Sequence, residues 1–144
     1  MIKARLRKGK LEDVYECLNR PYTVSGKVVK NRGIGTGIGF PTANIIYPVD
    51  KLIPNNGVYT GKAETEFGTF NAIINIGIQP TVSNKNTPMI EAHLLDFNND
   101  LYDTTIKIKI YSWIRNIIKF DNYDELINQL KKDKKCTERY FGLI

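Results

Sequence analysis

The stretch that decides the fold is Thr105–Arg115, which reads T-I-K-I-K-I-Y-S-W-I-R. Successive side chains of a β-strand point to opposite faces of the sheet, so strict alternation indicates a strand with one buried face. The isoleucines are expected to share the buried face: Ile106, Ile108, Ile110 and Ile114. The other face is expected to carry Lys107, Lys109, Tyr111 and Trp113. The alternation therefore predicts a half-buried strand.

Further strand-like segments lie upstream of this one. They are Tyr22–Lys30, Ala43–Tyr47, Val58–Thr65, Thr69–Ile76 and Ile90–Asp96. Glu66–Gly68 predicts a hairpin turn, because glycine supplies the positive φ that such turns require. About six short strands without intervening helices favour an antiparallel sheet that is closed, or nearly closed, into a barrel, since closure removes exposed edges.

A helix is expected at each end of the chain. At the C-terminal end, Asn122 and Glu125 form a capping-box pattern, and Gly142 is a stop signal. The apolar residues recurring at helical spacing are Tyr123, Leu126, Ile127, Leu130 and Phe141. A short amphipathic helix is expected over Leu11–Leu18, within a lead-in segment of residues 1–21. Residues 22–144 are expected to form one mainly β domain.

Composition is that of an ordinary globular protein of 144 residues, 42% hydrophobic and 25% charged. The sequence has no apolar run long enough to cross a membrane and no signal-peptide core at Met1–Arg5, so we expect a cytoplasmic protein without a membrane partner. Cys17 and Cys136 match no metal-binding spacing. The net charge of +6 favours an anionic partner, for which we expect a nucleotide rather than a nucleic acid.

The segment Asn31–Ile45, read N-R-G-I-G-T-G-I-G-F-P-T-A-N-I, is the first candidate site. Its glycines allow backbone N–H groups to approach a phosphate closely, and Thr42 and Asn44 offer neutral oxygens of the kind that a hard divalent cation accepts. The alternative is a hairpin loop rich in turn formers. The spacing fits neither a P-loop nor a dinucleotide fingerprint, so any phosphate here would be bound by a loop of the barrel.

Glu91 and His93 form the second candidate site. Alternation places both side chains on one face of their strand, where either could act as a general base. Spacing alone favours the plainer interpretation, a solvated glutamate beside a structural histidine. Trp113 and Tyr111 could stack on a planar ligand, although packing beneath the C-terminal helix is the commoner role of such aromatics.

Several motifs in this order resemble the riboflavin kinase family. They are Gly39–Ile45 (G-F-P-T-A-N-I), Gly57–Tyr59 (G-V-Y), Asn75–Gly77 with Pro80–Thr81, Glu91–Phe97 (E-A-H-L-L-D-F), and Ile114–Arg115 with Lys119–Phe120. The resemblance runs from about Tyr22 to the C-terminus. Residues 2–22 are similar to the stretch just before the kinase module of bifunctional bacterial enzymes, whose N-terminal FMN adenylyltransferase domain is not in this chain. We therefore expect a standalone kinase or an excised module.

The resemblance implies a small closed antiparallel Greek-key barrel with a C-terminal helix. It also implies transfer of the ATP γ-phosphoryl group to the riboflavin 5′-hydroxyl, giving FMN and ADP. Glu91 would be the catalytic base, and Thr42 and Asn44 would hold Mg²⁺ or another divalent cation. The nucleotide-binding residues would be Gly33, Gly35, Gly37, Gly39, Pro41 and Thr42. Arg115 and Trp113 are candidates for flavin binding.

Three departures from the family pattern are expected to affect catalytic efficiency rather than the class of reaction. Thr36 stands where a basic residue is common, Ile117 where an acidic residue is usual, and Asp103 where a glycine is usual. None of them alters Thr42, Asn44 or Glu91. The alternative function is a non-catalytic flavin- or RNA-binding regulatory module on the same barrel. A separate adenylyltransferase domain or protein, acting in FAD synthesis, is a further candidate partner.

Overall fold

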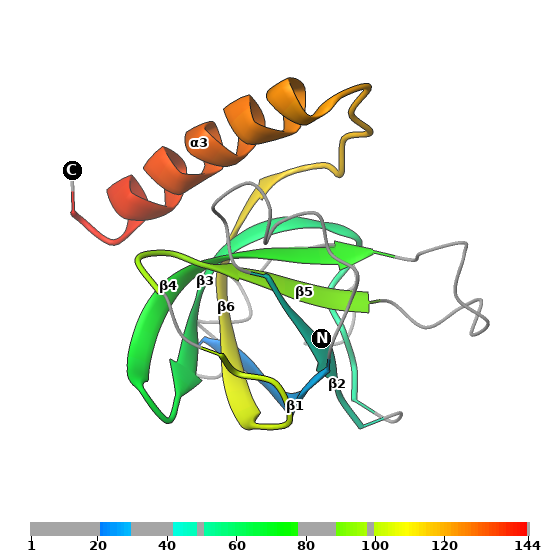
Figure 1. Cartoon of the computed structure of the whole chain (residues 1–144), viewed down its shortest axis with the longest axis vertical. Coiled ribbons are helices and arrows are strands. Elements are labelled where there is room, and N and C mark those ends of the chain that lie inside the picture. Colours follow the sequence, from blue (N-terminus) through cyan, green and yellow to red (C-terminus); the bar gives the residue numbers. More distant parts are fainter. Residues whose placement is uncertain (1–20, 30–41, 49–50, 78–88, 98–99, 144) are drawn as a thin grey trace.

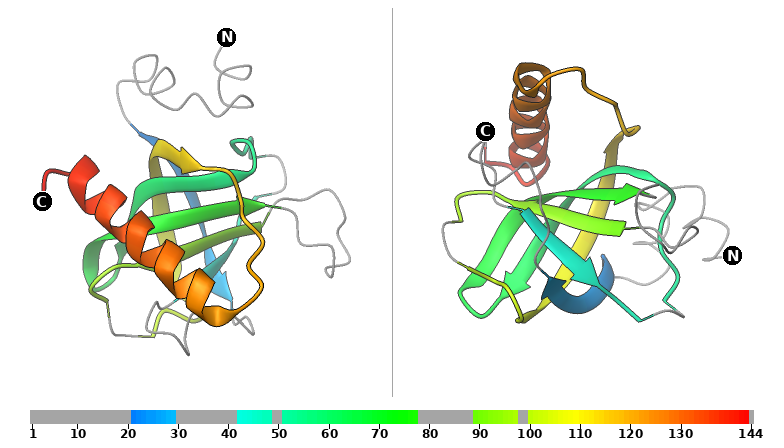
Figure 2. Two further views of the ribbon diagram at one scale, coloured as in Figure 1. Left: turned by 90° about the horizontal axis from the view of Figure 1, so that it is seen from above. Right: turned by 45° about the vertical axis from the view of Figure 1, so that its right-hand side comes forward.

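The computed structural model describes residues 21–29, 42–48, 51–77, 89–97 and 100–143. Within them, six strands form a closed antiparallel barrel in the order β1-β2-β5-β4-β3-β6. The strands are β1 (Tyr22–Val29), β2 (Thr42–Ile46), β3 (Gly57–Thr65), β4 (Gly68–Gly77), β5 (Met89–Leu94) and β6 (Thr105–Arg115). One helix, α3 (Tyr123–Tyr140), lies outside the barrel across β3 and β4 (Figures 1 and 2). The expected helix at Leu11–Leu18 lies outside the described residues.

The order of the strands is that of a Greek key. Strands β3, β4 and β5 follow one another as neighbours, and β6 returns to pair with β3 on its other side. The predicted hairpin between β3 and β4 is confirmed, with Gly68 at φ +117°. The closed barrel and its C-terminal helix are thus as expected.

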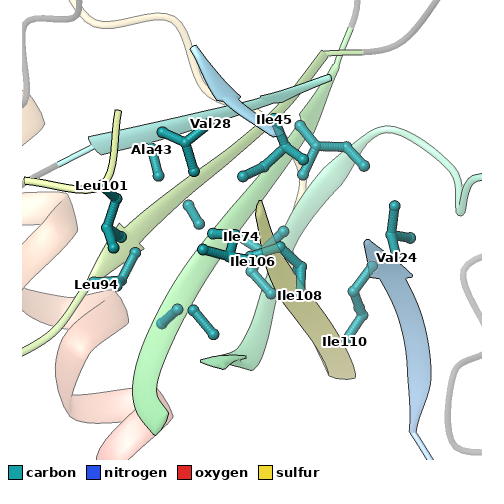
Figure 3. Close-up of a cluster of buried hydrophobic side chains, with 14 of the residues drawn as sticks. Val24, Val28, Ala43, Ile45, Ile74, Leu94, Leu101, Ile106, Ile108 and Ile110 are labelled. Atoms are coloured by element: carbon teal, nitrogen blue, oxygen red, sulfur yellow. The ribbon is translucent and has the colours of Figure 1, made fainter. Parts of the chain in front are cut away.

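The interior of the barrel is filled by aliphatic side chains from the inward-facing position of every strand. Strand β6 contributes Ile106, Ile108 and Ile110, each at most 1% exposed. Figure 3 shows these isoleucines beside Ile74 of β4, with Val24, Val28, Ala43 and Ile45 of β1 and β2 around them. Burial of this aliphatic surface is the main favourable term for folding.

One expectation about β6 is wrong, because the strand changes register twice against β3. Irregularities lie between the pairs Gly61↔Ile110 and Thr60↔Ser112, and between Tyr59↔Trp113 and Val58↔Arg115. A bulge inserts an extra residue and so exchanges the faces beyond it. Ile114 therefore leaves the face of the other isoleucines. It packs with a second apolar cluster beneath α3, formed by Val58, Ile73, Leu95 and Leu130.

The helix begins where the sequence predicts. Asn122 caps it by accepting a hydrogen bond from the Glu125 amide at 3.0 Å, while the Glu125 carboxylate accepts from the Asp121 amide at 3.2 Å. Leu130 is buried as expected, but Tyr123 is 60% exposed and adds nothing to the core. Helix α3 ends at Tyr140, followed by Gly142 at φ +75°. No helix of the described chain is long and apolar enough to cross a membrane.

Candidate active site

The outer faces of β2, β5 and β4 carry the candidate site. Inward-facing Ala43 and Ile45 alternate with Thr42 and Asn44 on β2, and Ile90, Ala92 and Leu94 alternate with Glu91 and His93 on β5. The polar side chains are therefore on the outside of the barrel. Paired strands bring them together: Thr42 lies opposite His93, and Asn44 opposite Glu91.

A row of paired residues crosses five strands at the level of Glu91. It runs from Asn44 through Glu91 and Asn75 to Val58 and Arg115. Directly paired residues of an antiparallel sheet share a face, with neighbouring strands roughly 4.8 Å apart. Two of the expected site residues, Asn44 and Glu91, are thus adjacent, and Asn75 flanks Glu91 on its other side.

His93 connects Glu91 to Thr42. Its Nδ1 lies 3.2 Å from Thr42 Oγ1, and its Nε2 lies 3.3 Å from Glu91 Oε1. The imidazole is enclosed, with 7% of its side chain exposed, whereas the Glu91 side chain keeps 22% exposed. A carboxylate that is held on one side and open on the other can accept a proton from a bound hydroxyl group.

Thr42 and Asn44 fit a divalent cation that is bound mainly through a nucleotide. Mg²⁺ prefers oxygen ligands and usually keeps several waters or phosphate oxygens, with only one or two ligands from the protein. Two neutral oxygen side chains on one face of β2 meet that requirement. The described residues contain no group of three His, Cys, Asp or Glu side chains that could hold a metal by themselves.

Most of the expected nucleotide-binding residues fall outside the described part of the chain. Gly33, Gly35, Gly37, Gly39 and Pro41 are among them, as is Thr36. Thr42, the last residue of that group, is the first residue of β2.

Arg115 is held by α3. Its Nε and Nη2 donate to the two carboxylate oxygens of Asp133 at 3.0 and 2.7 Å, and its Nη1 donates to the Asn116 carbonyl oxygen at 3.0 Å. Asp133 is 1% exposed and also accepts a hydrogen bond from Gln129 at 3.0 Å. This carboxylate on the helix is the partner of Arg115, which stands two positions before Ile117.

Trp113 packs beside Tyr59 of β3. Their rings meet edge to face with centroids 5.4 Å apart, and a Cβ on Gly57 would come within 2.3 Å of the indole. Trp113 is 37% exposed. Tyr111, expected on the same face, instead contacts Tyr140 and Phe141 at the end of α3, because the first register shift of β6 falls between Ile110 and Ser112, at Tyr111 itself.

The position of His93 between the expected base and the expected cation ligand is not predicted by the sequence. Alternation placed His93 beside Glu91, but the contact with Thr42 depends on the pairing of β2 with β5. The two strands are separated by more than forty residues of sequence, and no local pattern fixes their register. Asn75 was missed as a neighbour of Glu91 for the same reason.

Comparison with known proteins assigns the family. A family model described as "Flavokinase: Riboflavin kinase" matches residues 18–141. The chain belongs to the riboflavin kinase family. The resemblance inferred from the motifs is confirmed by this match, which covers the whole barrel and α3.

Relatives of this chain include longer, bifunctional proteins. The bifunctional riboflavin kinase/FMN adenylyltransferase of Bacillus subtilis (strain 168) is 39% identical over 143 residues, which is 98% of this chain and 45% of that protein. A homologue in Buchnera aphidicola subsp. Schizaphis graminum is 40% identical over 99% of this chain and 46% of its own length. The chain thus spans about half the length of these curated relatives.

Solved structures share the fold. The riboflavin kinase of Trypanosoma brucei superposes with a TM-score of 0.60 and 25% identity, over 84% of this chain and 80% of its own. A Streptococcus pneumoniae protein, named a macrolide-efflux protein, superposes with a TM-score of 0.88 and 29% identity, over 95% of this chain and 45% of its own.

Proposed function

We propose that this chain transfers the γ-phosphoryl group of ATP to the 5′-hydroxyl of riboflavin, giving FMN and ADP. The observation that carries the proposal is the cluster of Thr42, His93 and Glu91 on the outer barrel face of a riboflavin kinase family member. In the reaction, the riboflavin oxygen forms a bond to the γ-phosphorus, the bond to the bridging β–γ oxygen breaks, and the hydroxyl proton is released.

Glu91 is the group proposed to receive that proton. Its carboxylate is partly exposed and contacts Nε2 of His93 on one side, so it can orient the attacking hydroxyl while it accepts the proton. Phosphoryl transfer depends more on positioning and charge neutralisation than on covalent catalysis. One well-placed carboxylate is therefore sufficient on the acceptor side.

Thr42 and Asn44 are proposed to hold Mg²⁺ or a similar divalent cation on the donor side. When bound, such a cation neutralises charge on the transferring phosphates. Thr42 is directed by its contact with His93 Nδ1, and Asn44 is buried next to Glu91 in the neighbouring strand. Gly33, Gly35, Gly37, Gly39 and Pro41 are proposed to surround the nucleotide phosphates.

Trp113 and Arg115 are proposed for the flavin side. Trp113 keeps part of its indole exposed for stacking on a planar ring. Arg115 lies in the same cross-strand row as Glu91, and any contact with flavin would compete with its hydrogen bonds to Asp133.

The decisive experiment incubates the protein with ATP, Mg²⁺ and riboflavin and separates the flavins by chromatography. Formation of FMN that requires ATP supports the proposal. Bound riboflavin without FMN would favour the alternative, a non-catalytic flavin- or RNA-binding module. Repeating the assay with Mn²⁺ and with EDTA tests the cation requirement.

We further propose a cytoplasmic location and association with FAD synthesis. Both rest on the relatives, which join a riboflavin kinase to an FMN adenylyltransferase in one protein. An adenylyltransferase domain or a separate protein is the partner that would consume FMN. Co-purification with such a partner is the measurement that tests this association.

A further inference from the structure

Both ring nitrogens of His93 contact polar side chains. The imidazole is enclosed on the outer barrel face, and each of its two nitrogens meets a different proposed functional group. Nε2 faces the carboxylate of Glu91, and Nδ1 faces the hydroxyl of Thr42. A histidine that only packs would not need a polar partner at each nitrogen, one from its own strand β5 and one from β2.

The two contacts together select one tautomer. A carboxylate only accepts hydrogen bonds, so the nitrogen facing Glu91 is the one that carries the proton. In a neutral imidazole the other nitrogen is then an acceptor, and the Thr42 hydroxyl donates a hydrogen bond to it.

We propose that His93, as the Nε2–H tautomer, is a positioning residue that links the base Glu91 to the cation ligand Thr42. It orients the Glu91 carboxylate through Nε2 and the Thr42 hydroxyl through Nδ1. In this way it fixes the position of the proposed base relative to the proposed cation ligand. This inference rests on the function proposed above for Glu91 and Thr42. Partners that orient catalytic or metal-binding groups typically contribute roughly 10- to 100-fold in activity or affinity.

The tautomer can be observed without any catalysis. His93 is the single histidine of the chain, so a long-range ¹H–¹⁵N spectrum of protein labelled with ¹⁵N-histidine reports this ring alone. From the contacts with Glu91 and Thr42 we expect Nε2 to be protonated and Nδ1 to be bare. Glu91→Gln should shift mainly the Nε2 resonance, and Thr42→Val mainly Nδ1. A ring protonated at Nδ1, whether neutral or imidazolium, would overturn the proposal.

Two substitutions separate the two contacts in kinetic assays. His93→Asn puts an amide near the place of Nδ1, so it keeps the contact with Thr42 and loses the contact with Glu91. Its kcat should fall by roughly 10-fold or more, with little change in KM for Mg-ATP. His93→Gln reaches toward the place of Nε2, so it should keep most of kcat and raise KM for Mg-ATP. Mg-ADP binding measured by calorimetry should weaken in His93→Gln and not in His93→Asn.

Thr137→Ala is the matched control. It removes a buried hydrogen bond of 3.1 Å to Thr60 of β3, a strand separated from β5 by β4, and should lower Tm without changing kcat or KM. If His93→Asn and His93→Gln lose activity equally, or neither changes it by more than about twofold, His93 only packs and the proposal fails. A protein that makes no FMN but shows the expected tautomer would instead contradict the proposed function.

Discussion

Glu91 is the residue whose chemistry the proposed reaction depends on most. General-base catalysis typically contributes roughly 10²- to 10⁴-fold, so Glu91→Ala is expected to lower kcat by at least 100-fold. The initial rate of FMN formation at saturating ATP and riboflavin measures this loss. Glu91→Gln keeps the size of the side chain and its place beside His93 but cannot accept the proton, so it should be almost as inactive. If Glu91→Ala keeps kcat within about threefold of the parent, Glu91 is not the base.

Asn44 tests the donor side of the site in the same way. It is 2% exposed and directly opposite Glu91 across β2 and β5. Removing its amide oxygen should raise both KM for Mg-ATP and the Mg²⁺ concentration required for half-maximal rate, by roughly 10- to 100-fold. We expect Asn44→Ala to leave KM for riboflavin nearly unchanged. If only KM for riboflavin rises, Asn44 acts on the acceptor side instead.

Asp103 adopts a backbone conformation that lowers the stability of the fold. Its φ is +66°, a left-handed conformation that glycine adopts freely and that other residues adopt at a cost. Lys27 Nζ is 3.9 Å from its carboxylate and both side chains are well exposed, so their ion pair contributes little. Asp103→Gly should therefore unfold with a free energy about 1 kcal/mol higher than Asp103→Ala in urea titrations. Equal stability of the two variants would show that the turn relaxes.

Helix α3 depends on one buried carboxylate. Asp133 accepts two hydrogen bonds from Arg115 and one from Gln129 while 1% exposed. Removing one partner of a buried pair leaves an uncompensated charge, so Asp133→Ala should lower the free energy of unfolding by about 3 kcal/mol. The control is exposed Lys132→Ala, which should stay within about 0.5 kcal/mol. A loss below about 1 kcal/mol in Asp133→Ala would mean that apolar packing alone holds α3.

How far the sequence predicts an element depends on whether its signal is local. The alternation of Thr105–Ile110, the turn at Gly68 and the cap at Asn122 each depend on a few neighbouring residues, and each is found where expected. The two bulges of β6 are not local, because they arise from how the strand pairs with β3. Tyr111 and Trp113 for that reason lie on different sides of their strand.

The same distinction holds for the site at the scale of the whole molecule. Strand alternation and the family motifs suffice to nominate Thr42, Asn44 and Glu91 as functional residues. Their neighbours are set by barrel closure, which brings β2 beside β5 and α3 beside β6. The link through His93 and the pairing of Arg115 with Asp133 could therefore be seen only in three dimensions.

Barrel closure also predicts how the protein responds to alkali. Burial raises the pKa of the phenols of Tyr22, Tyr47 and Tyr59 above the ordinary value of 10.0. Above about pH 10 the unfolded chain loses these protons while the folded chain keeps them, so the unfolded state binds fewer protons and the free energy of unfolding falls as pH rises. The slope approaches about 1.4 kcal/mol per pH unit for each phenol that remains protonated only in the folded state.

Urea titrations at several pH values from about pH 8 to pH 12 measure that slope. Tyr59→Phe removes the most deeply buried of these three phenols together with its hydrogen bond to the Asn55 carbonyl oxygen. Its free energy of unfolding should be about 1 kcal/mol lower near neutral pH, but should fall less steeply above about pH 10 than that of the parent, because one titrating group is gone. Parallel curves for Tyr59→Phe and the parent would show that Tyr59 titrates alike in the folded and unfolded chains. In that case its enclosure by the barrel would contribute nothing to the alkaline loss of stability.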